Sequence, residues 1–148
     1  MKTKNSVVIL MADDDADDRL MAKEAFEENK LRNDLRFVEN GEQLLDYLLH
    51  RNGFTPENAP KPGLILLDLN MPKKDGREAL KEIKSHPNLR RIPVVVLTTS
   101  KAEEDILKSY DLGVNSFITK PVTFDQLVNV TAQLSGYWLE IVELPRPS

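Results

Sequence analysis

The chain has 148 residues, a formal net charge of −4 and no cysteine. This length suits a single domain, and 41% hydrophobic with 30% charged residues is typical of a globular protein, not of a disordered one. Disulfides and thiolate chemistry are excluded, and 24 acidic against 20 basic residues leave no basic stripe that would favour nucleic acid.

The N-terminus has only part of the pattern of a secretory signal. Its apolar run at 7–12 has six residues, which is too short for a signal peptide, and acidic residues follow it directly. No segment is long and apolar enough to span a bilayer. We therefore expect a cytoplasmic protein without membrane contacts.

Five short apolar runs, rich in β-branched residues, predict five strands. In chain order they are residues 7–12, 35–38, 64–67, 93–97 and 116–119. Apolar residues at helical spacing follow each run. These stripes are Met21, Ala22, Ala25 and Phe26; Leu44, Leu45, Leu48 and Leu49; Ala79, Leu80 and Ile83; Ile106, Leu107 and Tyr110; and Phe124, Leu127, Val128, Thr131 and Leu134. Such alternation predicts a doubly wound α/β fold, with a parallel sheet covered by helices on both faces.

Two segments do not fit this alternation. Residues 51–62, RNGFTPENAPKP, contain three prolines and predict a long surface loop before the third strand. Residues 136–148 begin with a helix-ending glycine and continue with a strand-like alternation. We therefore expect one domain over residues 1–135 and a C-terminal extension over 136–148.

The predicted strands end in polar side chains. In a doubly wound sheet, ligands bind outside these carboxyl ends. The side chains there are Asp13, Asp14 and Asp15 after the first strand, Asp68 after the third, Thr98, Thr99 and Ser100 after the fourth, and Lys120 before Pro121 after the fifth. Two carboxylates about 4 Å apart repel by roughly 4 kcal/mol at an effective dielectric near 20, which a bound cation would relieve. Oxygen ligands without histidine or cysteine favour Mg²⁺.

Asp68 ends the apolar run LILLD, where burial disfavours a carboxylate. One explanation is that this acid merely caps a strand. Another is that a carboxylate beside Mg²⁺, the Thr98 hydroxyl and the Lys120 ammonium is a nucleophile for a phosphoryl group. Phosphorylated Asp68 would then present three oxygens to these partners. The register of Asp14, Thr98 and Lys120 with Asp68 favours the second explanation.

Residues 7–135 resemble the receiver domain of bacterial response regulators, the CheY-like fold. The resemblance rests on Asp13 and Asp14, on DLNMPKKDG with Asp68, on LTTS with Thr98 and on FITKP with Lys120. The stretches DDDADDRLMAKEAF, RNGFTPENAPKPGLILLDLNMPKKDGREAL and LTTSKAEEDI are similar to stand-alone receivers paired with cyanobacterial phytochrome kinases. The resemblance implies the strand order 2-1-3-4-5 and a histidine kinase, of phytochrome type, as the partner.

The resemblance also implies roles at the metal site. Asp68 would be the phosphoacceptor and also a metal ligand, Asp14 a direct Mg²⁺ ligand, and Asp13 a ligand acting mostly through water. Asn70 would offer its backbone carbonyl to the metal. With Ser100, it would also flank the attacking water and tune the lifetime of the acyl phosphate.

Thr98 and Phe117 match the switch pair of the family. The Thr98 hydroxyl would move toward the phosphoryl group and the Phe117 ring would turn inward behind it. Phe117 has no hydroxyl, which argues against an output that needs a tyrosine contact. Lys120 would bind the phosphoryl group, and its bond to Pro121 resembles the lysine–cis-proline step of the family.

We expect no second domain after residue 148, and we therefore expect the output to pass by protein contact. The predicted fourth helix, fifth strand and fifth helix would form the contact face. The apolar tail suggests a homodimer that uses this face and the extension, as in phytochrome-linked receivers. The tail residues are Tyr137, Trp138, Leu139, Ile141 and Val142. Alternatively, the tail folds back on its own domain.

The residues argue against three rival functions. A Mg²⁺-dependent phosphohydrolase would carry a second acid two residues after its nucleophile, but Asn70 occupies that position. A nucleotide-binding protein would carry a P-loop or G-x-G-x-x-G, and neither is present. A receiver-fold scaffold that works without phosphorylation is disfavoured by the intact pocket. The remaining acids Asp15, Asp17 and Asp18 are expected at a helix start, and His50 and His86 lie away from the strand ends.

Overall fold

The computed structural model describes residues 8–28, 34–69, 76–98 and 116–119, together with 125, 126, 128, 129 and 132, which are helical. For Thr98 and 116–119 it describes the backbone. Five strands and three continuous helices lie within these segments. They are β1 Val8–Ala12, α1 Ala16–Glu28, β2 Asp34–Val38, α2 Gly41–Leu49, β3 Leu64–Asp68, α3 Gly76–Ser85, β4 Val94–Thr98 and β5 Ser116–Thr119. The predicted fourth helix, most of the fifth, and the tail 136–148 lie outside the described residues.

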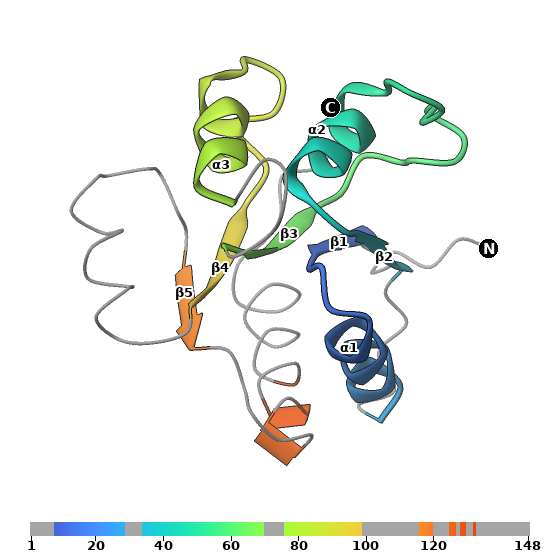
Figure 1. The fold of residues 1–148 in the computed structure, drawn as a ribbon, viewed down its shortest axis with the longest axis vertical. Helices are drawn as coiled ribbons and strands as arrows, with labels where there is room; N and C mark the ends of the chain where they lie inside the picture. The colour runs from blue at the N-terminus through green and yellow to red at the C-terminus, as the bar shows by residue number, and fades with distance from the viewer. Residues whose placement is uncertain are drawn as a thin grey trace.

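The five strands form one parallel sheet in the order β2-β1-β3-β4-β5. This order confirms the topology that the receiver resemblance implies. In Figure 1, α1 lies on one side of the sheet, and α2 and α3 lie on the other. Both faces are therefore covered, as the continuously apolar strands predict.

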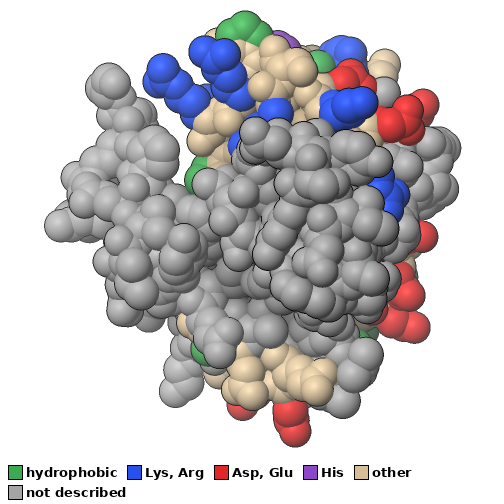
Figure 2. Space-filling model, turned by 90° about the vertical axis from the view of Figure 1, so that its left-hand side faces the viewer, with side chains coloured by type: hydrophobic (Ala, Val, Ile, Leu, Met, Phe, Trp, Pro, Cys, Tyr) green, Lys and Arg blue, Asp and Glu red, His purple; other side chains and the backbone are tan. Residues whose placement is uncertain are grey.

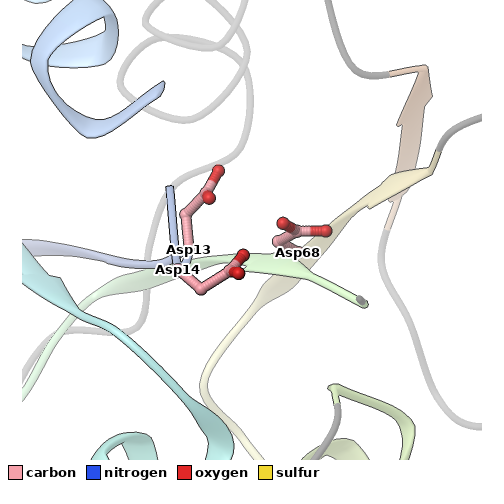
Figure 3. Close-up of side chains that lie close together, drawn as sticks. All are labelled: Asp13, Asp14 and Asp68. Atoms are coloured by element: carbon pink, nitrogen blue, oxygen red, sulfur yellow. The ribbon is translucent and has the colours of Figure 1, made fainter. Parts of the chain in front are cut away.

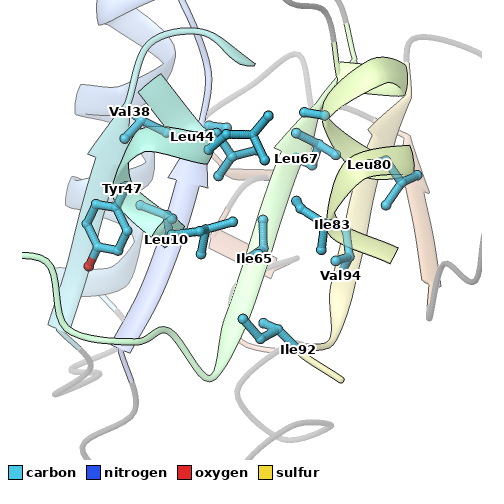
Figure 4. Close-up of a cluster of buried hydrophobic side chains, with 14 of the residues drawn as sticks. Leu10, Val38, Leu44, Tyr47, Ile65, Leu67, Leu80, Ile83, Ile92 and Val94 are labelled. Carbon is cyan, nitrogen blue, oxygen red and sulfur yellow. The ribbon is translucent and has the colours of Figure 1, made fainter. Parts of the chain in front are cut away.

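Alternate residues of the central strands supply two separate cores. Leu10, Ile65, Leu67 and Val94 belong to the cluster that packs beneath α2 and α3, part of which Figure 4 shows. The intervening residues, among them Met11, contribute to the cluster beneath α1. The period of two in a strand thus sends neighbouring side chains to opposite faces of the sheet.

Short polar side chains fix the starts of two helices. The Oδ1 of Asp15 accepts hydrogen bonds from the backbone N–H groups of Asp17 at 2.8 Å and Asp18 at 3.3 Å. Asn40 caps α2, since its Oδ1 accepts from the Gln43 N–H at 2.8 Å. The Gln43 side chain reaches back in turn and accepts from the Glu39 N–H at 2.8 Å. The bonds accepted by Asp15 and Asn40 satisfy helix N–H groups that have no carbonyl partner within the helix, and the bond from Glu39 ties the residue before the cap to α2.

The loop at 51–62 is held against α2 and β2 by side chains that bind its carbonyl groups. The Tyr47 hydroxyl donates to the Pro60 carbonyl, and the His50 Nε2 hydrogen-bonds the Ala59 carbonyl, both at 2.8 Å. His50 ends α2 in the left-handed conformation, with φ of 55°. Most of the loop is exposed, as predicted, but Ala59 is fully buried. His50 therefore has a structural place in this loop.

The charge of the molecule is unevenly distributed. Figure 2 shows Lys and Arg side chains gathered at the upper end of the molecule, where α3 lies in Figure 1. The basic residues of α3 and the segment after it are Arg77, Lys81, Lys84, Arg90 and Arg91. The Lys84 ammonium donates to the carbonyls of Arg90 and Ile92 at 3.1 and 3.2 Å, and burial lowers its pKa below the ordinary value. The chain-wide charge balance does not reveal this basic end.

None of the helices in the described segments combines the length and the hydropathy needed to span a membrane.

Candidate metal centre

Strand pairing brings two predicted acids together at the carboxyl edge of the sheet. Ala12 of β1 pairs with Leu67 of β3, so the residues that follow them, Asp13 and Asp68, leave neighbouring strands at the same level. Asp14 is next in the chain, and Figure 3 shows the three carboxylates at this edge. One oxygen from each lies within 4.8 Å of the other two. The structure therefore assembles three of the side chains predicted for the metal.

These three acids differ in their exposure to solvent. Asp13 is fully buried and Asp68 is 3% exposed, whereas Asp14 is exposed. Three like charges at this spacing repel one another, and the repulsion is strong where burial reduces screening. A divalent cation would offset the repulsion. Three carboxylates with one side open to water suit a hard cation that keeps part of its hydration, such as Mg²⁺.

The other acids of the first loop lie outside this cluster. Among the residues that the structure describes, Asp13, Asp14 and Asp68 are the one group of three or more potential metal ligands brought together. Asp15 uses its carboxylate to cap α1, and Asp17 belongs to the first turn of the same helix. Their placement at the helix start agrees with the sequence prediction.

Gly76 brings the start of α3 against the end of β3. Its N–H donates to the Leu69 carbonyl at 3.0 Å. A Cβ at Gly76 would stand 2.7 Å from the backbone oxygen of Asp68 and 2.7 Å from the Leu69 Cα, closer than ordinary contacts allow. Glycine therefore permits this approach, which positions the backbone that carries Asp68.

The backbones of Thr98 and Phe117 are placed next to this edge. Leu97 of β4 pairs with Asp68, so Thr98 follows at the level of the cluster. Phe117 of β5 pairs with Val96. The side chains of Thr98 and Phe117 are not among the described groups, and Asn70, Ser100, Lys120 and Pro121 lie outside the described residues, as do Tyr137, Trp138, Leu139, Ile141 and Val142.

Comparison with known proteins decides the family. The sequence profile of the response regulator receiver domain matches residues 9–132. The chain belongs to the response regulator receiver family. Receivers are signalling domains of two-component systems, in which histidine kinases are their partners.

Individual relatives place this receiver more narrowly. Response regulator Rcp1 of Synechocystis sp. (strain ATCC 27184 / PCC 6803 / Kazusa) is 44% identical over 139 residues, which are 94% of this chain and 92% of Rcp1. The structure of the phosphorylated cyanobacterial phytochrome response regulator RcpA superposes with a TM-score of 0.84 at 43% identity, covering 95% of this chain and 99% of RcpA. The Mn²⁺-bound form of Rcp1 gives a TM-score of 0.82 at 42% identity, with 95% of this chain and 99% of that one covered. The receiver is thus similar to phytochrome-associated response regulators.

A relative with a different regulatory name is similar at lower identity. The probable methanogenesis regulatory protein FilR2 of Methanothrix harundinacea (strain 6Ac) is 35% identical over 149 residues, covering 100% of this chain and 94% of FilR2.

The sequence patterns do not single out Arg19, which contacts the site. Its guanidinium donates to the backbone carbonyl of Asp13 at 2.8 Å. The one sequence signal is weak: a cation near the start of a helix is slightly unfavourable next to the helix dipole, and a contact elsewhere would offset that cost. The neighbouring acids Asp17 and Asp18 favour the helix start, and they make the unfavourable position of Arg19 hard to recognise in the sequence.

Proposed function

We propose that this receiver accepts a phosphoryl group on Asp68 from a phosphohistidine of a histidine kinase, and that it does so with Mg²⁺. The observation that carries the proposal is the convergence of Asp13, Asp14 and Asp68 within 4.8 Å at the carboxyl edge of the sheet. A family that receives phosphoryl groups, and relatives solved in phosphorylated and Mn²⁺-bound forms, support it.

In the proposed step, a carboxylate oxygen of Asp68 attacks the phosphorus of the donor. A P–O bond to Asp68 forms as the P–N bond of the phosphohistidine breaks, and the electron pair returns to the imidazole nitrogen, which takes up a proton. Asp13 and Asp14 would hold the cation together with Asp68. When bound, Mg²⁺ would neutralise the charge on the transferred oxygens.

The remaining pocket roles follow the receiver resemblance. Thr98 and Lys120 contact the phosphoryl group, and Phe117 turns inward behind Thr98 to change the contact face. Asn70 gives its carbonyl to the metal and, with Ser100, sets the lifetime of the acyl phosphate. The position of Thr98 directly after the pairing of Leu97 with Asp68 supports the first of these roles.

We further propose a phytochrome-type, light-sensing kinase as the donor, and a homodimer that uses the predicted fourth helix, β5, the predicted fifth helix and the tail. The likeness to Rcp1 and RcpA supports a phytochrome-type kinase, because the chain is 44% and 43% identical to these proteins but 35% identical to FilR2. The apolar residues of 137–142 support the dimer.

Labelling by a small phosphodonor tests the function. The full chain is incubated with acetyl phosphate and Mg²⁺, and its intact mass is measured. We expect one phosphoryl group per chain, none in Asp68→Asn, and an unchanged result in Asp17→Asn, whose carboxylate lies outside the cluster. Labelling that persists in Asp68→Asn would refute the assignment of the acceptor. A wild-type chain that takes up no phosphoryl group would favour a scaffold that works without phosphorylation.

A further inference from the structure

The acidic loop between β1 and α1 is held by hydrogen bonds that meet at Asp13. The Asp13 N–H donates to the Val38 carbonyl at 3.0 Å, which joins the loop to the end of β2. The Asp13 Oδ1 accepts from the Asp15 N–H at 2.9 Å. The Asp13 carbonyl accepts from the Arg19 guanidinium at 2.8 Å. Both backbone groups of this buried acid are therefore fixed.

Among these bonds, the contribution of Arg19 depends on its side chain. Arg19 lies near the start of α1 and reaches back over the loop, and its side chain is 19% exposed. Its second terminal nitrogen lies 3.9 Å from the Glu39 carboxylate, a group that is 61% exposed. An ion pair that long and that exposed is weak. The short, charged hydrogen bond to the Asp13 carbonyl is the stronger contact.

We propose that Arg19 is a positioning residue of the cation site. By binding the Asp13 carbonyl, it holds the loop in the conformation that directs Asp13 and Asp14 toward Asp68. The inference rests on the proposed function, because it requires that the three carboxylates take Mg²⁺. Groups that orient metal ligands in this way typically change affinity by about 10- to 100-fold when they are removed.

Arg19 could also oppose Mg²⁺ binding through its charge. The two effects change Mg²⁺ affinity in opposite directions when Arg19 is replaced. A guanidinium next to an acidic cluster repels a cation, so loss of its charge alone would tighten Mg²⁺ binding. Loss of the bond that orders the loop would weaken Mg²⁺ binding, because the free energy of Mg²⁺ binding would then have to offset the conformational entropy lost when the loop becomes ordered. The direction of the change therefore decides whether Arg19 positions the ligands.

The matched control is Arg36, which makes contacts of the same kind away from the site. Its guanidinium donates to the Asn58 carbonyl at 2.8 Å and pairs with Asp34 at 3.0 Å. Asp34 stands at the start of β2, at the opposite edge of the sheet from Asp13. Replacing Arg36 removes one arginine–carbonyl bond and one ion pair without touching the acidic loop.

Calorimetric Mg²⁺ titration of the full chain tests the inference, with thermal unfolding of the metal-free proteins as a second readout. For Arg19→Met we expect Mg²⁺ affinity to fall by about 10-fold. For Arg36→Met we expect wild-type affinity despite a similar loss of stability. Arg19→Lys, which keeps the charge and a donor, is expected to fall between Arg19→Met and the wild type, and it supplies the test if Arg19→Met does not fold.

Each remaining outcome overturns the inference. Unchanged or tighter binding in Arg19→Met would mean that the arginine does not position the ligands. An equal loss in Arg19→Met and Arg36→Met would reduce the effect to general destabilisation. A wild-type chain that binds no Mg²⁺ would instead refute the proposed metal dependence. This outcome is distinguishable from failure of the Arg19 inference, because it is seen in the wild type and needs no variant.

Discussion

At the scale of single residues, the cluster joins two buried carboxylates to one that faces water. Asp13 and Asp68 are held at the ends of β1 and β3, and Asp14 leaves the site open on its side. That these acids lie at one edge is predictable from sequence, because the carboxyl ends of parallel strands share an edge. That they meet also requires β1 and β3 to be neighbours, which the receiver resemblance implies. Arg19 is not predictable in this way, since its contact depends on the path of the loop and not on any periodicity.

Tyr47 gives a residue-scale prediction about pH. It is 2% exposed, and its hydroxyl donates to the Pro60 carbonyl at 2.8 Å. Burial raises the pKa of Tyr47, Arg36 opposes this and Asp34 adds to it. The pKa of Tyr47 is therefore higher in the folded than in the unfolded protein. Its contribution to the free energy of unfolding is full below the unfolded pKa, near 10, and is lost as the pH rises through the folded pKa.

Tyr47→Phe is therefore expected to lower the free energy of unfolding by about 1 kcal/mol at pH 7, the usual net value of such a hydrogen bond. The difference from the wild type should shrink as the pH rises above about 10. Urea unfolding of both proteins across this range measures it. A difference that grows with pH would contradict the assigned direction of the shift.

At the scale of elements, hydrogen bonding decides where strands and helices end, and apolar periodicity decides where they lie. The sequence predicts that the fourth strand includes Pro93, but β4 begins at Val94. Proline has no N–H to donate, so only its carbonyl pairs, accepting from the Ile65 N–H at 3.0 Å. α2 begins at Gly41 because Asn40 caps it. The buried large apolar residues of α1 and α3 nevertheless fall on the predicted stripes, as do Leu44, Leu45 and Leu48 of α2. Tyr47 is also buried in α2 and is not part of the predicted stripe.

The contact between β3 and α3 makes Gly76→Ala an element-scale test. The added methyl would meet the backbone of Asp68 and Leu69, which cannot move aside like a flexible side chain. We expect a loss of about 1 to 3 kcal/mol in the free energy of unfolding, as for other overpacked sites, together with weaker Mg²⁺ binding. Lys81→Ala, an exposed change on the same helix, should stay within about 0.5 kcal/mol of the wild type. Wild-type stability and Mg²⁺ affinity in Gly76→Ala would show that the approach is not tight.

At the scale of the whole molecule, the alternation of strands and helices predicts the layers but not the order of the strands. The order β2-β1-β3-β4-β5 came from the resemblance to receivers, because alternation alone permits several arrangements. The packing of residues 51–62 was not predictable either, since Tyr47 and His50 must first be placed in α2 before they can bind that loop. The dimer face and the tail remain predictions.

The central claim is that three carboxylates from two strand ends form one cation site, and Mg²⁺ titration by calorimetry tests it most directly. The account predicts one Mg²⁺ per wild-type chain, the same affinity in Asp17→Asn, and strongly weakened binding in Asp14→Asn. Wild-type protein that binds no Mg²⁺, or an Asp14→Asn chain that binds it as tightly as the wild type, would contradict the account.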